Sequence, residues 1–180
     1  MRHNTKTPPA ECCRVEQLKV PVTSDADIVL ARQRARELAS EANFEPLEST
    51  LIATAISELA RNILQHAGEG EVSIKIDRQE DGTVLIVVAR DNGPGIPNVK
   101  RALKDGFSTS GGLGLGLPGV KRLMDEFEIV SHQDHGTTVI AKKWACRSTS
   151  AGPGRASKAS FKRRASVTAG KLAAVGSVTR

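Results

Sequence analysis

The chain has 180 residues, 39% of them hydrophobic and only 3% aromatic, and its formal net charge is +6. This length suits one domain with a real hydrophobic core. No apolar run approaches the roughly 18 residues that a membrane span needs, and the first residues contain no apolar stretch typical of a secretory signal. We therefore expect a cytoplasmic protein with no membrane partner.

The basic charge is concentrated at the end of the chain. Eight of the 26 basic residues and none of the 20 acidic ones lie in 145–180. This segment is rich in Ser, Ala and Gly, so it cannot bury enough apolar surface to offset its ordering entropy. We expect a flexible N-terminus at 1–13, a folded domain at 14–144 and a disordered basic tail at 145–180. The tail could contact an acidic partner or be a solvated extension, and we do not expect nucleic-acid binding, because Phe161 alone is no stacking platform.

Apolar periodicity predicts a series of strands and helices in the folded part. In chain order they are a half-buried strand at 14–22, a helix from Asp25 to near Asn43, a helix from Pro46 to about Gly68, a hairpin of strands at 71–77 and 83–90, a short helix at 98–105, a helix at 117–127 with Phe127 facing inward, and strands at 128–133 and 137–144. Strands and helices do not alternate regularly. The order favours an α+β two-layer sandwich.

A row of polar side chains borders the apolar stripe of the second predicted helix. The stripe consists of Ile52, Ile56, Leu59 and Ile63. At 100° per residue, Glu58, Asn62 and His66 lie along one edge of it. This position suits side chains that line a ligand cleft beneath the helix. The alternative is the ordinary flank of an amphipathic helix.

A carboxylate follows the second strand of the predicted hairpin. Asp91 ends a strand that is apolar almost throughout, and Gly93 and Gly95 follow in a turn-forming DNGPG stretch. A carboxylate at this position can accept a hydrogen bond from an exocyclic amine such as that of adenine. The alternative is a turn without a ligand.

Five of the 16 glycines lie between residues 111 and 119, ahead of the helix predicted at 117–127. Bare backbone amides before a helix can bind phosphate. Gly114 to Gly119 spells GxGxxG, but no buried strand precedes it, so a dinucleotide-binding βαβ unit is excluded. A Walker loop is excluded as well, because Val120 stands where the lysine belongs.

Together these stretches resemble the ATP-binding boxes of the GHKL fold. The matching motifs are Glu58-x-x-x-Asn62-x-x-x-His66, Asp91-x-Gly93-x-Gly95, Gly112-x-Gly114-x-Gly116-Leu117 and Gly136-Thr137-Thr138. The small size and the stretches DNGPGI and GTTV are most similar to the RsbT-type switch serine/threonine kinases. The resemblance covers residues 12–144 and leaves the basic tail outside.

The resemblance implies a four-stranded mixed sheet with helices on one face and ATP between the layers. It makes Asn62 the Mg²⁺ ligand and Asp91 the group that binds adenine N6, with Thr138 nearby. Residues 108–117 would cover the phosphates. The implied ATP-binding set is Asn62, His66, Asp91, Gly93, Gly95, Gly112, Gly114, Gly116, Leu117 and Thr138. Glu58 would be the general base, unless its carboxylate only forms a salt bridge with Arg61 or Arg32.

The function implied by this resemblance is phosphorylation of a Ser or Thr on a STAS-domain antagonist within a stress-response partner-switching module. A PP2C-type phosphatase or a sigma factor would then be regulated downstream. The alternative is an anti-sigma factor or ATP-gated sequestering protein, in which capture of the partner rather than catalysis is the function.

Overall fold

The computed structural model describes residues 16–79, 82–104 and 116–146. The predicted N-terminal segment 1–13 lies outside these ranges, as does the predicted tail from residue 147 onward. Gly112 and Gly114 of the predicted phosphate loop also lie outside them.

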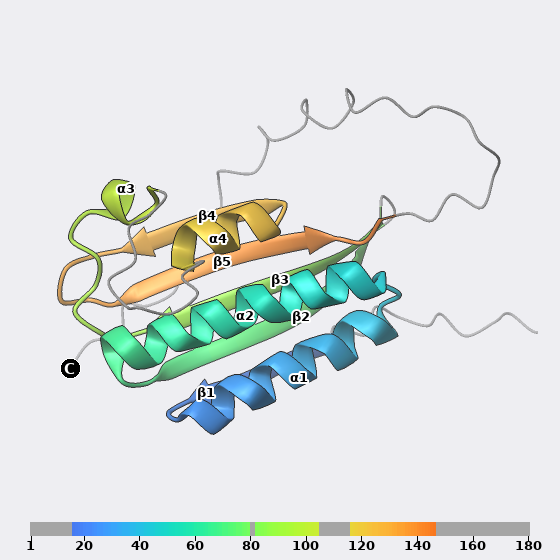
Figure 1. Cartoon of the computed structure of the whole chain (residues 1–180), viewed down its shortest axis with the longest axis horizontal. Helices are drawn as coiled ribbons and strands as arrows, with labels where there is room; N and C mark the ends of the chain where they lie inside the picture. Colours follow the sequence, from blue (N-terminus) through green and yellow to red (C-terminus); the bar gives the residue numbers. More distant parts are fainter. Residues whose placement is uncertain (1–15, 80–81, 105–115, 147–180) are drawn as a thin grey trace, which may run out of the picture. The chain divides into compact units, whose positions relative to one another are not determined.

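A five-stranded sheet forms one layer of the fold (Figure 1). Its strands are β1 (Glu16–Val22), β2 (Gly70–Gln79), β3 (Gly82–Asp91), β4 (Glu126–Ser131) and β5 (Thr137–Trp144), in the order β1-β2-β3-β5-β4. Each neighbouring pair is antiparallel. The expectation of four strands in a mixed sheet is therefore wrong, since β2–β3 and β4–β5 are hairpins whose strands must run in opposite directions.

Helices α1 (Asp25–Glu41), α2 (Pro46–Ala67) and α4 (Gly116–Leu123) cover one face of this sheet, and α3 (Val99–Ala102) is a single short turn (Figure 1). α2 begins with proline in its first turn and ends at Gly68, whose φ of 78° is the left-handed conformation that glycine adopts most easily. The α+β two-layer class predicted from the sequence is confirmed. None of the helices in the described ranges is long and apolar enough to cross a membrane.

The core lies between the helices and one face of the sheet. It is built from the predicted stripe of α2, the small residues of α1 and alternate residues of the central strands. Its largest fully buried side chains include Ile52, Ile56, Leu59, Ile74, Ile76 and Leu85. The four alanines Ala31, Ala35, Ala39 and Ala42 let α1 pack closely, because they carry only a methyl group each. This packing fixes α2 against β2 and β3.

The last predicted helix is shorter than expected. α4 ends at Leu123, and Phe127 lies in β4, where it packs at the edge of the core. The backbone N–H of Asp125 donates to the carbonyl of Lys142 at 2.9 Å, so the chain already joins β5 there. The Asp125 carboxylate then accepts the N–H of Trp144 at 2.9 Å. Pairing with β5 therefore ends the helix before its apolar pattern does.

Glu48 ties the start of α2 to the end of β5. Its side chain is buried, one carboxylate oxygen accepts the N–H of Glu45 at 2.9 Å and the other accepts the N–H of Cys146 at 3.0 Å. Glu48→Ala leaves two backbone donors without their partner. We expect it to lower the free energy of unfolding by about 2 kcal/mol, measured by urea denaturation.

The matched control is Glu37→Ala, because the Glu37 carboxylate is paired with Arg34 on the exposed side of α1. Exposed ion pairs contribute about 0–1 kcal/mol. Equal losses in the two variants would contradict the proposed role of Glu48.

Candidate functional site

Strand β3 delivers Asp91 to the edge of the core. Side chains alternate between the two faces of a strand. Leu85, Val87 and Ala89 are buried on the helix-covered face, and Asp91 is the next residue in that row. It pairs with Gly70 on one side and with Thr137 on the other. The buried strand therefore ends in a carboxylate that faces the helix layer.

The two oxygens of the Asp91 carboxylate have different surroundings. Oδ1 accepts the N–H of Gly93 at 2.9 Å and the N–H of Thr137 at 3.2 Å. Within the described part of the chain, Oδ2 has no hydrogen-bond partner in the structure. The two backbone donors thus fix the orientation of the carboxylate and leave one oxygen available to accept a hydrogen bond from a ligand.

The glycines beside Asp91 allow protein segments to approach closely. A Cβ on Gly93 would lie 2.6 Å from the Cβ of Ala67, at the end of α2. Gly95 has a φ of 73°, and a Cβ there would meet the carbonyl oxygen of His132. Both glycines belong to the ATP-binding set that the resemblance implies. The contacts show a packing reason for them as well, because they seat the DNGPG turn between α2 and the β4–β5 turn.

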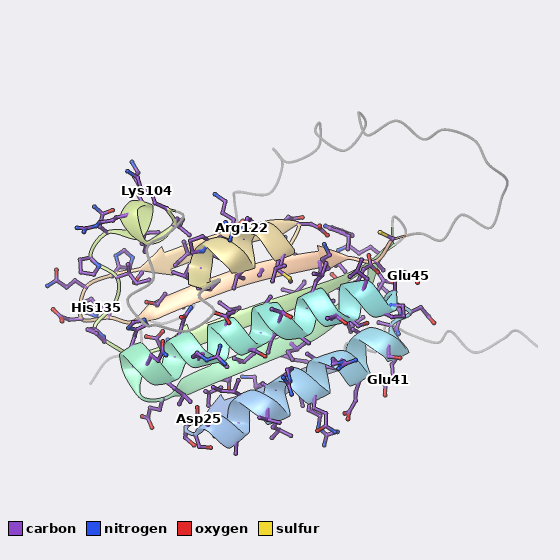
Figure 2. All side chains as sticks on the ribbon, viewed as in Figure 1. Asp25, Glu41, Glu45, Lys104, Arg122 and His135 are labelled. Carbon is purple, nitrogen blue, oxygen red and sulfur yellow. The ribbon has the colours of Figure 1, made fainter. Side chains whose placement is uncertain are left out.

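The turn after β3 is held by the β4–β5 hairpin. Ser131 Oγ accepts the N–H of Ile96 at 2.8 Å and lies 2.9 Å from Thr137 Oγ1. The N–H of Asp134 donates to the carbonyl of Pro94 at 2.9 Å. His135 in this hairpin and Lys104 after α3 lie at the same end of the sheet, whereas Glu41 and Glu45 lie at the other end (Figure 2). The candidate site therefore has a preformed wall at one end of the fold.

The structure places Thr137, rather than the predicted Thr138, beside Asp91. Thr137 pairs with Asp91 and shares the face of buried Val139. Thr138 pairs with Arg90 on the opposite face of the sheet. A GTT sequence does not say which threonine faces the helices. The alternation from buried Val139 and Ala141 back along β5 was the signal that could have found it.

The predicted polar row on α2 runs beside this wall. The Glu58 side chain is 17% exposed, Asn62 is half-buried and His66 is exposed. Asn62 Nδ2 is buried and has no hydrogen-bond partner among the residues that the structure describes. Such an orphaned polar atom is costly unless another group binds there. The polar row therefore contains one buried amide NH₂ group that lacks a hydrogen-bond acceptor within the described ranges.

Glu58 contacts two other parts of the site. Its Oε1 accepts a hydrogen bond from Arg61 Nη1 at 2.9 Å, and its Oε2 accepts the N–H of Gly116 at 3.2 Å. The salt bridge to Arg61 that was the structural alternative for Glu58 is thus present. Gly116 is the first residue of α4, and Leu117 packs its side chain against the core. Glu58 consequently links α2 to the end of the predicted phosphate loop.

Helix α4 carries two basic residues. Lys121 and Arg122 are both exposed, and Arg122 lies on α4 (Figure 2). Among the residues that the structure describes, no group of three or more His, Cys, Asp or Glu side chains could hold a metal ion.

Comparison with known proteins gives consistent matches. Residues 48–145 match the family of histidine kinase-, DNA gyrase B- and HSP90-like ATPases. The chain is 50% identical over 131 residues to the serine/threonine-protein kinase RsbT of Bacillus subtilis, covering 72% of this chain and 97% of that protein. It is 33% identical over 100 residues to an anti-sigma F factor of Clostridium kluyveri, covering 53% of this chain and 70% of that protein.

A solved structure shows the same fold. The RsbU and RsbW domains of a Mycobacterium tuberculosis protein match with a TM-score of 0.52 and 19% sequence identity. The match covers 72% of this chain and 33% of that one. At this identity the likeness concerns the fold alone.

Proposed function

This chain belongs to the GHKL family of histidine kinase-, DNA gyrase B- and HSP90-like ATPases and, within it, to the RsbT-type serine/threonine kinases, and from this premise we propose that it transfers the γ-phosphate of Mg-ATP to a Ser or Thr of a STAS-domain antagonist. The released kinase would then act on a PP2C-type phosphatase or a sigma-factor pathway. The four motif boxes predicted the family correctly. The substrate, the metal and the residue roles are the parts that we propose.

The observation that carries this proposal is the oriented carboxylate of Asp91. Its Oδ1 is held by the N–H groups of Gly93 and Thr137. Its Oδ2 is left to accept the exocyclic amine of adenine. Thr137, at the same end of the sheet, replaces Thr138 in the proposed site, since its hydroxyl lies on the same side as the carboxylate. Gly112 and Gly114 would donate backbone N–H groups to the phosphates, whereas the N–H of Gly116, predicted to do the same, donates to Glu58 Oε2.

The residues present fit a magnesium ion bound to a triphosphate. Mg²⁺ prefers oxygen ligands and is bound in many phosphoryl-transfer sites by one or two protein groups, several waters and the phosphates. Asn62 would contribute its amide oxygen, and its buried Nδ2, which lacks a partner among the described residues, would donate to a phosphate oxygen. The ion would neutralise charge on the phosphates during transfer. Glu58, one helical turn from Asn62, would accept the proton of the attacking hydroxyl.

The second candidate function is sequestration of a sigma factor. The similarity to an anti-sigma F factor favours it, because the same nucleotide site would serve a protein that captures its partner. The greater identity and nearly complete coverage of the RsbT relative favour the switch kinase.

Transfer of labelled phosphate tests the two functions. The purified chain, a STAS-domain protein from the same organism and γ-labelled ATP should yield a labelled Ser or Thr, and EDTA or Asn62→Ala should abolish the label. Pull-down with the full chain should retain the STAS protein or the phosphatase. Retention of a sigma factor without any labelled STAS protein would support sequestration instead.

Thr137→Val should weaken ATP binding about tenfold. It removes a hydroxyl beside the Asp91 carboxylate, which is proposed to bind adenine, while it keeps the shape of the side chain. Thr138→Val is the matched control. It makes the same change one residue later, on the opposite face of β5, and should leave the dissociation constant unchanged. Calorimetry with Mg-ATP measures both, and a greater loss in the Thr138 variant would contradict this assignment.

A further inference from the structure

The Glu58 carboxylate is held at both of its oxygens. Arg61 Nη1 donates to Oε1 at 2.9 Å, and the backbone N–H of Gly116 donates to Oε2 at 3.2 Å. We propose that Arg61 is a positioning residue for phosphoryl transfer, which together with the Gly116 amide fixes the direction of the Glu58 carboxylate. This inference rests on the proposed function, in which Glu58 is the base.

The two donors approach Glu58 from different directions. Arg61 lies on the same helix, three residues later and nearer the solvent side of α2, and its side chain is 47% exposed. Gly116 belongs to α4, which packs against α2. One donor is therefore a side chain on the base's own helix, and the other is a backbone amide at the end of the predicted phosphate loop, where α4 begins. A glutamate with rotatable χ angles is confined by this pair of contacts to one orientation.

Orientation matters for the reaction that Glu58 would assist. The substrate hydroxyl oxygen forms a bond to the γ-phosphorus while the bond from that phosphorus to the β,γ-bridging oxygen breaks, and ADP leaves with the electron pair. The hydroxyl proton passes to a carboxylate oxygen of Glu58. Each carboxylate oxygen has a second lone pair that can receive it. Arg61 keeps its own proton, since a guanidinium stays charged, and acts only through Glu58.

An Arg–Glu pair of the same spacing exists away from the site. Arg34 Nη1 lies 3.0 Å from Glu37 Oε2 on the exposed side of α1, three residues apart as in the Arg61–Glu58 pair. The Glu37 side chain is 42% exposed, against 17% for Glu58. Only the pair on α2 includes a contact with α4. Arg34→Ala is therefore a matched control for the loss of an arginine from a helix.

The test uses the full chain with its STAS substrate. Arg61→Ala should lower kcat about tenfold, with the KM values for ATP and for the protein substrate changed less than twofold. Arg61→Lys should recover part of kcat, because lysine supplies one donor without the planar fork. Arg34→Ala should retain the parent kcat. A parent-like kcat in Arg61→Ala, or a raised KM for the protein substrate at unchanged kcat, would overturn the inference.

A double-mutant cycle separates this inference from the proposed function. If Arg61 acts through Glu58, adding Arg61→Ala to Glu58→Gln should not lower the residual transfer rate further. If the rate losses of the two single variants multiply in the double variant, Arg61 acts independently of Glu58. The inference would then fail while the kinase function stands. Full activity of Glu58→Gln would instead show that Glu58 is not the base, and the inference about Arg61 would fail while the kinase function stands.

Discussion

Asp91→Asn should weaken ATP binding about 100-fold while leaving the fold intact. In the parent chain Oδ1 accepts two backbone N–H groups and Oδ2 is left for the ligand. The asparagine oxygen would take the place of Oδ1, because only an acceptor can satisfy the amides of Gly93 and Thr137. The NH₂ group must then occupy the Oδ2 position and face the adenine amine, donor against donor.

The size of this effect follows from the hydrogen bond that is lost. A bond to a charged group contributes about 1.5–3 kcal/mol, and an unpaired donor adds a desolvation cost. Because about 1.4 kcal/mol corresponds to a tenfold change in affinity, the two terms together give about two orders of magnitude. Stability should change little, since the Oδ1 contacts remain.

The same geometry predicts a change of base preference. Inosine triphosphate carries an oxygen where ATP carries the amine, so the asparagine NH₂ would face an acceptor. Calorimetry with both Mg-nucleotides should show that the parent prefers ATP and that the Asp91→Asn chain reverses or abolishes this preference. The control is Asp77→Asn on neighbouring β2. The Asp77 carboxylate is outside the proposed site and accepts a hydrogen bond from Gln79 Nε2. If both variants bound ATP like the parent, Asp91 would not recognise the base.

The sequence predicted the elements well wherever an apolar period ran without interruption. The α2 stripe and the hairpin of β2 and β3 illustrate this, because burial of those side chains decides the local structure. The end of α4 escaped prediction for a different reason. Its apolar pattern continues to Phe127, but Asp125 already pairs with β5, and a contact with a strand so much later in the chain leaves no local signal.

The sequence predicted which residues belong to the site, but it did not predict which of them contact one another. The motif spacing predicted Asp91 and the DNGPG turn as parts of the site. The choice between Thr137 and Thr138 depended on the register of β5 against β3. The contact between Glu58 and the Gly116 amide joins residues that are 58 positions apart. Such contacts arise from the packing of α4 on α2, which no spacing within either segment reveals.

Glu58→Gln should lower the rate of phosphoryl transfer by about 10²–10⁴ while ATP affinity stays within about threefold of the parent value. Glutamine has nearly the same shape and can still accept one hydrogen bond from Arg61 or Gly116, so the helix contact is largely kept. It cannot take up the hydroxyl proton. The loss should therefore be confined to kcat.

Single-turnover transfer of labelled phosphate, with calorimetry for ATP, separates chemistry from binding in this variant. Glu41→Gln is the control, because Glu41 is exposed at the end of α1, far along the fold from the site (Figure 2). A parallel fall in ATP affinity would mean that Glu58 mainly holds α4 through Gly116. Parent-like transfer would show that the hydroxyl loses its proton to another group. A fall in kcat of this size at parent-like ATP affinity is expected if the carboxylate itself receives that proton, since the amide keeps one of the two contacts and lacks the basicity.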